Sequence, residues 1–410
     1  MHDAMQSLRV LVAEKLYAPE EVAGPVAVLL EGTTIRDIWR GMDAASVRHR
    51  LAEQMPNSVV EVTDLGSWCL APGYIDLHTH GFCGHDVTTG SREDVEAMAR
   101  ELPRTGVTSF FPTIATLTQV ETALQVRRLT AVAENQVHTS AAEILGLRLE
   151  GPFINRAKKG AQYESGIRPP DSAEMEELAA LAQGWVRIID YAPEEDVDAR
   201  FLATVVRLGI LPCMGHTAAT YEQAIRAVDG GVRHATHLFN AMSQLEHRAP
   251  GVAGALLTDQ RATTEIIADG IHMHPAITKL VIAARGFRDV ALITDAVAPA
   301  GLPEGDYDFV GRKVTVCDGA VRLTSGSLAG SVLTLDRAVR NTVAFTGLGW
   351  SEAICMATHV PARIAGVALR KGRVAPGADA DLIALDSHGF VQRTWVRGCL
   401  AHQGMPDRDK

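Results

Sequence analysis

The sequence predicts an α/β fold: a (β/α)8 TIM barrel together with a small β-sandwich domain built from both chain ends. Apolar runs of strand length alternate with segments of helical period over about 250 residues, as in such a barrel. Both ends of the chain leave this pattern. The length of 410 residues suits a barrel with an accessory domain. The eight candidate strands are residues 73–77, 108–113, 143–149, 186–191, 211–215, 232–236, 264–268 and 290–294.

The first 70 residues carry short β-like runs at 8–12, 26–30 and 59–62, separated by turns that contain Gly, Asn and Asp. They indicate a small sheet. Amphipathic stretches between the later strands indicate helices, because their apolar residues recur at the helical period. These stretches include residues 91–103, 117–134, 172–182, 196–208, 220–228 and 275–285.

Residues 309–323 predict a β-hairpin that turns at Asp318-Gly319, a strong turn signal. Helices are expected at 333–345 and 351–357, and short strands follow to the chain end. We therefore expect a small β-sandwich domain from residues 1–70 plus 365–410, and a barrel from 71–364 with a hairpin insertion near 305–325.

Composition excludes several classes of protein. Apolar residues make up 47%, charged residues 21%, and the formal net charge is -10. Acidic and basic residues are interspersed, which does not fit a nucleic-acid or membrane-binding surface. The six cysteines are scattered without a CxxC pair, as expected of reduced thiols in the cytoplasm. No signal segment or membrane span is expected.

Ionisable side chains gather where the predicted strands end. His78 and His80 end the first strand and point to the same side, since strand residues i and i+2 share a face. In this fold the chemistry lies at the carboxyl ends of the strands. Six of the eight strands finish in such residues: His78 and His80, Glu150, His216, His237, Asp269 followed by His272, and Asp295.

Each of these residues alone has a simpler interpretation. His216 and His237 could be structural histidines, Glu150 a loop carboxylate, and Asp295 a turn cap. His234 lies three residues before His237, so the spacing predicts that it points away and serves packing or the surface. The convergence of six strand ends favours a site.

One carboxylate and two to four imidazoles around a cavity suit Zn²⁺, with Fe²⁺ as the alternative. Such an ion lowers the pKa of its water to about 7. Asp295, on the last strand, is placed to take a proton from that water and give it to a leaving amine. These parts can hydrolyse an amide or deaminate a ring.

Two basic segments bear on the substrate. Arg248 lies in a loop with Pro250 and Gly251, where a guanidinium suits an anionic group such as phosphate. Lys158 and Lys159 follow Glu150 at short distance. Solvated surface charges are the alternative for both.

At this point the chain resembles the N-acetylglucosamine-6-phosphate deacetylases of the amidohydrolase superfamily. The matching segments span nearly the whole chain in the right order. They are PGYIDLHTHG (72–81), LEGPFIN with KKGA (149–161), GHT (215–217), HATHLFNAM (234–242), IADGIH (267–272), ITDA (293–296), SLAGS (327–331) and KGRVAPGADADLIALD (371–386).

The resemblance implies a TIM barrel of the metal-dependent amidohydrolase type, acting on a small sugar phosphate. Glu150, His216 and His237 would hold the principal ion, and His78 with His80 match the pair that supports a second ion in some members. One or two ions per subunit are thus expected. The resemblance also implies roles for Asp295 as general base and then acid, His272 as the group polarising the acetyl carbonyl, and Ala161, Asn240, Ala241, Arg248, Leu328, Ala329 and Gly330 as sugar-phosphate contacts. Arg248 would reach a neighbouring subunit in a homodimer.

The chain departs from this family at Gln162, where many members carry a His. Gln can donate a hydrogen bond to a hydroxyl or phosphate but cannot become cationic. The fourth strand ends without Lys, which argues against superfamily members that bridge two ions with a carboxylated lysine. Two rivals remain: the same reaction on N-acetylgalactosamine 6-phosphate, and a non-catalytic binding protein on this frame. A ring deaminase is disfavoured by the Arg248 loop.

Overall fold

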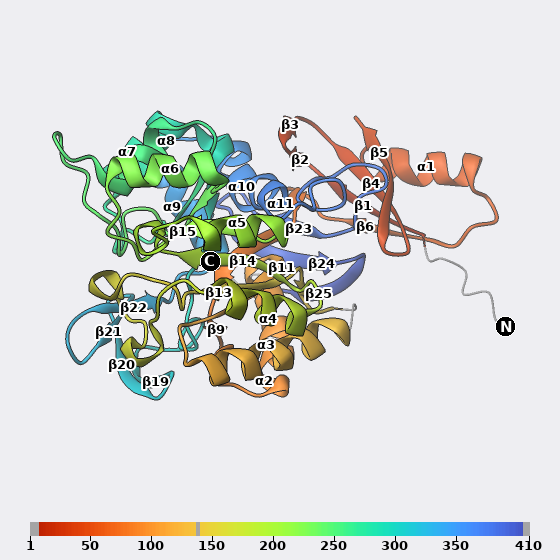
Figure 1. Ribbon diagram of the computed structural model, residues 1–410. Coiled ribbons are helices and arrows are strands. Elements are labelled where there is room, and N and C mark those ends of the chain that lie inside the picture. Colours follow the sequence, from red (N-terminus) through yellow and green to blue (C-terminus); the bar gives the residue numbers. More distant parts are fainter. Residues whose placement is uncertain (1–7, 137–139, 405–410) are drawn as a thin grey trace.

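The two ends of the chain meet in a pair of β-sheets on one side of the molecule, at the right of Figure 1. The computed structural model describes residues 8–136 and 140–404. One sheet has the order β5-β4-β1-β6, and the other β25-β24-β23-β7-β2-β3. The strands are β1 Leu8–Ala13, β2 Lys15–Ala18, β3 Glu20–Val22, β4 Val26–Glu31, β5 Thr34–Arg40, β6 Val60–Asp64, β7 Cys69–Pro72, β23 Leu382–Leu385, β24 Val391–Val396 and β25 Cys399–Gln403.

Alternation along β1 explains how its sheet packs on both faces. Val10 and Val12 pack with Trp39 and with Val47 of α1 (Ala44–Gln54), which covers the outer face. Leu11 and Ala13, on the opposite face of β1, pack instead against strands of the six-stranded sheet. A strand presents successive side chains to opposite faces, so the apolar residues of one strand fill two cores and join the sheets as a sandwich.

Eight parallel strands form the barrel in the order predicted. They are β8 Tyr74–Thr79, β11 Val107–Ile114, β13 Leu147–Glu150, β14 Val186–Tyr191, β15 Leu211–Met214, β16 His234–Ala235, β17 Thr263–Ile266 and β18 Val290–Leu292, with the short β12 Glu143–Ile144 beside β11. Helices surround them: α2 Arg92–Glu101, α3 Gln119–Glu134, α4 Ser172–Ala182, α5 Arg200–Arg207, α6 Tyr221–Gly230, α7 Gly251–Thr258, α8 Pro275–Arg285, α9 Leu335–Thr346, α10 Trp350–Ala357 and α11 His359–Ile364.

The segment after β18 brings the last strand back to the first. Asp295 N donates to His78 O at 2.9 Å, and the Thr294 hydroxyl donates to Asp76 Oδ2 at 2.6 Å. Burial raises the pKa of Asp76 to about 6, although the Thr294 hydrogen bond opposes this change. The ring is thus nearly closed at the position where His78, His80 and Asp295 lie.

The insertion after β18 is larger than the predicted hairpin. It forms a four-stranded antiparallel sheet from β19 Gly305–Phe309, β20 Arg312–Cys317, β21 Ala320–Leu323 and β22 Leu328–Ser331. It lies at the lower left of Figure 1, where the barrel strands end. Its buried face packs on Val297, two residues after Asp295. A further short hairpin, β9 Gly81–Phe82 with β10 His85–Asp86, follows the first barrel strand.

Local signals position the helices. Ser91, Thr118 and Thr220 each form a capping box at the start of a helix, which satisfies amide donors that the first helical turn leaves free. The sequence did not indicate α1, because its apolar positions are few among charged residues and it lies between strand-like runs. The expected strand 232–236 is also shorter, since regular pairing covers only His234 and Ala235.

We propose the division into a small domain and a barrel at the boundaries given above; residues 1–7, 137–139 and 405–410 of those ranges lie outside the described residues. Among the described helices, each is too short or too polar to cross a lipid bilayer. All six cysteines lie in the described part and are unpaired.

Candidate metal centre

The predicted ligands meet at the carboxyl ends of the barrel strands. His78 lies on β8 and His80 directly follows it, and their Nε2 atoms are 3.2 Å apart. Glu150 ends β13, and its Oε1 lies 3.0 Å from Nε2 of both His216 and His237. All five side chains are buried. Residues far apart in the sequence are therefore brought together as predicted.

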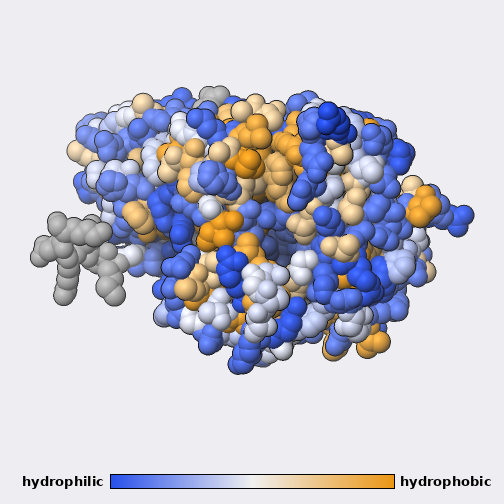
Figure 2. Space-filling model, turned by 90° about the vertical axis from the view of Figure 1, so that its left-hand side faces the viewer, coloured by the Kyte–Doolittle hydropathy of each residue, from blue (hydrophilic) through white to orange (hydrophobic). Residues whose placement is uncertain are grey.

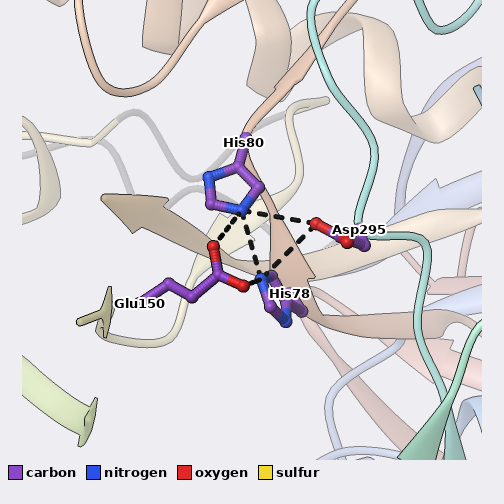
Figure 3. A group of neighbouring side chains, drawn as sticks. All are labelled: His78, His80, Glu150 and Asp295. Atoms are coloured by element: carbon purple, nitrogen blue, oxygen red, sulfur yellow. Dashed lines mark hydrogen bonds and ion pairs between the residues drawn. The ribbon is translucent and has the colours of Figure 1, made fainter. Parts of the chain in front are cut away.

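Glu150 is shared by two overlapping groups of potential ligands. One group is His78, His80, Glu150 and Asp295, and the other is Glu150, His216 and His237; within each, the ligand atoms lie within 4.8 Å of one another. Figure 3 shows the first group, with the two imidazoles and the two carboxylates directed at one another. Two such groups joined by one carboxylate offer places for one or two cations.

Backbone conformation turns several of these residues inward. His216 has φ 49°, His237 φ 27° and Asp295 φ 49°, and each follows the last residue of a barrel strand by two or three positions. Non-glycine residues rarely adopt positive φ, and such strain concentrates at functional sites. The positive φ of His237 also breaks the regular strand geometry that the spacing argument assumed. His234 therefore does not point away as the spacing predicts. It is fully buried and lies 2.8 Å from Glu265 inside the barrel.

Backbone carbonyls orient two of the imidazoles. Nδ1 of His80 lies 3.0 Å from Thr113 O, and Nδ1 of His216 lies 2.8 Å from Lys158 O. A carbonyl can only accept, so each Nδ1 carries the proton and each Nε2 is free to bind a cation. These rings are already in the tautomer that a metal ligand requires.

The electrostatics of the site favour positive charge. Burial alone would lower the pKa of His78, but Asp295 and Glu150 outweigh it and raise that pKa to about 10. Burial likewise opposes protonation of His80, whose hydrogen bonds with Asp295 and Glu150 raise its pKa to about 9. Facing imidazole nitrogens at 3.2 Å around two buried carboxylates suit a divalent cation, which would take the place of these protons.

The cluster opens into a cavity of about 310 Å³ between the strand ends and the inserted sheet. Figure 2 shows this side of the molecule, hollowed near its centre. His272 lines the cavity, and its Nδ1 lies 2.7 Å from Asp269 Oδ2. Of the predicted sugar-phosphate contacts, those that line it are Ala161, Asn240, Ala241, Leu328 and Gly330.

Two predicted contacts lie elsewhere. Ala329 is fully buried, in the core of the inserted sheet. Arg248 is exposed and is not part of the cavity wall of its own chain. Glycine is required at position 330 for a steric reason. A Cβ there would lie 2.9 Å from Asp295 O and 2.5 Å from a methyl group of Val297. The backbone of the inserted sheet thus supports the Asp295 turn directly.

Gln162 contacts the cluster instead of facing only the cavity. Its Nε2 donates to Glu150 Oε2, and its Oε1 accepts from the Thr116 amide at 2.7 Å. Both ends of the side chain are therefore used, and the amide orientation is fixed by Thr116. Gln162 thus supports Glu150, the carboxylate that the two groups of potential ligands share.

We expect Gln162→Leu to lower the free energy of unfolding of the metal-free protein by about 1–3 kcal/mol. The substitution leaves the buried Thr116 amide without its acceptor, which costs about that much. Urea-induced unfolding of the chelator-treated protein measures the loss. An unchanged midpoint would contradict the structural role assigned to this side chain.

Several polar residues of the barrel interior were missed by the sequence analysis. Arg148, on β13, is fully buried and contacts Asp190 and Glu265. Arg312, from the inserted sheet, lines the cavity and was also missed, whereas Lys158, which the sequence did single out, lines it as well. A charged residue inside a strand-like run was the available signal for Arg148 and Glu265.

The barrel and its buried imidazole–carboxylate cluster define a metal-dependent hydrolase. Residues 69–400 match the model of the amidohydrolase family. N-acetylgalactosamine-6-phosphate deacetylase of Escherichia coli O157:H7 is 39% identical over 83% of this chain and 90% of its own length. N-acetylglucosamine-6-phosphate deacetylase of Bacillus subtilis is 35% identical over 92% and 96%. The chain belongs to the amidohydrolase family.

Solved structures agree over the whole length. N-acetyl-D-glucosamine-6-phosphate deacetylase of Mycobacterium smegmatis superposes with a TM-score of 0.87 at 29% identity, covering 96% of this chain and 100% of that one. The Pasteurella multocida N-acetylglucosamine-6-phosphate deacetylase gives the same TM-score and identity. The predicted barrel and enzyme class are confirmed.

Proposed function

We propose that this enzyme hydrolyses the acetamide of N-acetylglucosamine 6-phosphate to glucosamine 6-phosphate and acetate, as a step of amino-sugar catabolism. The observation that carries the proposal is the pair of ligand groups sharing Glu150 beside Asp295, at the base of a cavity of about 310 Å³. Relatives named N-acetylgalactosamine-6-phosphate deacetylase and N-acetylglucosamine-6-phosphate deacetylase match most of the chain.

Glu150, His216 and His237 would hold one divalent cation, and His78 with His80 a second. Zn²⁺ is favoured by the nitrogen and oxygen donors, with Fe²⁺ as the alternative. When bound, such an ion lowers the pKa of water to about 7 and supplies a nucleophile at neutral pH.

The chain's own groups would move the proton and hold the carbonyl. Asp295 would accept the proton of the attacking water and then deliver it to the departing amine. Asp269 Oδ2 lies 2.7 Å from Nδ1 of His272 and accepts its proton. This leaves the other ring nitrogen of His272 for a substrate in the cavity that the ring lines. Burial opposes charge on His272, but the Asp269 hydrogen bond raises its pKa. A protonated ring would donate to the carbonyl oxygen and stabilise the developing negative charge.

The cavity wall supplies groups for the sugar phosphate. Asn240 and the backbone near Ala161, Ala241, Leu328 and Gly330 offer hydrogen bonds to hydroxyls. Lys158 and Arg312 add positive charge on the wall, which suits a phosphate. Arg248, exposed in its own chain, would contact the phosphate in a partner subunit. We accordingly propose a homodimer, working in the cytoplasm on a small molecule without nucleic-acid or membrane partners.

N-acetylgalactosamine 6-phosphate is the second candidate substrate, because a relative with that activity in its name is 39% identical. The two sugars differ at one hydroxyl. A site that hydrogen-bonds a hydroxyl discriminates between the two epimers. We expect acetate release from both compounds, with the higher kcat/KM on N-acetylglucosamine 6-phosphate, because that sugar is in the names of the Bacillus subtilis relative and of both solved structures. A higher kcat/KM on N-acetylgalactosamine 6-phosphate would instead identify that sugar as the preferred substrate. Release of acetate from neither would contradict the proposed reaction.

A further inference from the structure

A network of buried charged side chains lies inside the barrel beneath the metal ligands. Arg148 is at its centre: its Nε and Nη2 contact Asp190 at 3.0 and 2.9 Å, and its Nη1 contacts Glu265 Oε1 at 2.6 Å. All three side chains are fully buried. A buried charge is costly unless it is paired, so these groups require one another.

The second oxygen of Glu265 lies beside a metal ligand. Oε1 is occupied by Arg148 and by Nε2 of His234 at 2.8 Å. Oε2 lies 3.6 Å from Nδ1 of His78. In the described part of the chain neither Glu265 Oε2 nor His78 Nδ1 has a hydrogen-bond partner. The two atoms are the unused acceptor and donor of adjacent buried groups.

We propose that Glu265 is the positioning residue that makes His78 a metal ligand. By accepting the proton of Nδ1, it leaves the lone pair of Nε2 directed at the cluster, where Glu150 and Asp295 lie. A carboxylate in this position also makes the imidazole more basic and fixes the ring. The inference rests on the proposed metal centre and adds a residue on β17 to it.

His78 differs in this respect from His80 and His216. Thr113 and Lys158 orient His80 and His216 with backbone carbonyls, which no substitution of a side chain removes. The orientation of His78 depends on one side chain. Arg148 and His234 both contact Oε1 of Glu265, so the buried carboxylate is paired with a cation and its Oε2 is left for His78.

Glu265→Gln tests the role because it keeps the size of the side chain. Arg148 can only donate, so the amide oxygen must remain on Arg148. The amide NH2 then faces Nδ1 of His78 and favours the opposite tautomer, with the proton on Nε2. Asp190→Asn is the matched control: it is equally buried and bonded to the same arginine, but its partners do not include His78.

The experiment uses the full chain, freed of metal and titrated with Zn²⁺, and with Co²⁺ followed by its absorption spectrum. His78→Ala identifies the ion that His78 binds. We expect Glu265→Gln to weaken binding of that same ion by about 10- to 100-fold and to change its Co²⁺ spectrum. Asp190→Asn should leave that dissociation constant near the parental value. The thermal unfolding temperature of both metal-free variants should be lower than that of the parent.

Three results would overturn the proposal: parental affinity in Glu265→Gln, equal loss of affinity in Asp190→Asn, or no change in His78→Ala. The titrations need no sugar substrate, so they stand apart from the proposed deacetylation. An enzyme that released acetate from neither epimer and still lost this ion in Glu265→Gln would contradict the substrate and support the positioning role.

Discussion

Asp295→Asn is expected to lower kcat by about 10³-fold or more while the metal content stays near the parental value. A general base that becomes a general acid contributes about 10² to 10⁴-fold, and an amide cannot take the proton. The carbonyl oxygen of Asn still presents an acceptor where Asp295 Oδ1 lies, 3.3 Å from His80 and 3.6 Å from His78. Acetate release and metal analysis of the same preparation measure the two quantities.

Asp76→Asn provides a matched control for this prediction. Asp76 is buried on the neighbouring strand, but its carboxylate bonds Thr294 and does not line the cavity. Its removal disturbs the same turn without removing the proton acceptor, so turnover should stay far closer to the parental rate. Parental turnover in Asp295→Asn would show that another group moves the proton.

The barrel could be predicted because its strands are apolar and separated by amphipathic helices. All eight strands lie where the alternation placed them, with differences of a few residues at their ends. The shortest, β16, was overestimated because regular pairing covers only His234–Ala235. Helix α1 was missed because only Ala44, Val47 and Leu51 of its residues are buried, too few to form a periodic pattern.

The convergence of the candidate ligands could be predicted because each lies at or just after the end of a strand, and strand ends share one edge of a barrel. Glu265 and Asp190 could not, because both lie within strands whose inward direction depends on the register of the closed ring. Gln162 was expected to face the substrate, but a loop conformation places its amide between Glu150 and Thr116. Local pattern carries no information about such contacts.

A second buried ionic cluster joins the end of the chain to the barrel. Lys371 is 1% exposed, and its ammonium contacts Glu143 at 2.8 Å, Asp379 at 3.0 Å and Asp381. Glu143 belongs to β12 at the barrel, whereas Asp381 directly precedes β23 of the sandwich. Arg370 also pairs with Glu143 and Asp379. One lysine therefore neutralises carboxylates from both parts of the fold.

Lys371→Met is expected to lower the free energy of unfolding by about 3–5 kcal/mol. Removing one partner of a buried ion pair leaves uncompensated buried charge, which costs about that much, and Asp381 loses its cationic partner. Lys313→Met is the control, since Lys313 and Asp308 are 72% and 69% exposed and such pairs contribute at most about 1 kcal/mol. Urea-induced unfolding compares both variants with the parent.

Lowering the pH should reduce the difference in the free energy of unfolding between Lys371→Met and the parent. Burial opposes ionisation of Glu143, but Arg370 and Lys371 lower its pKa from 4.5 to about 2. Because the folded-state pKa lies below the unfolded value, this pairing stabilises the fold fully above pH 4.5 and is lost as the pH falls toward 2. Stability measured from pH 7 to pH 3 tests this. A difference that stayed constant over that range would mean that packing of the lysine stem, and not its charge, joins the sandwich to the barrel. A loss in Lys313→Met as large as that in Lys371→Met would contradict the importance assigned to burial of the ion pair.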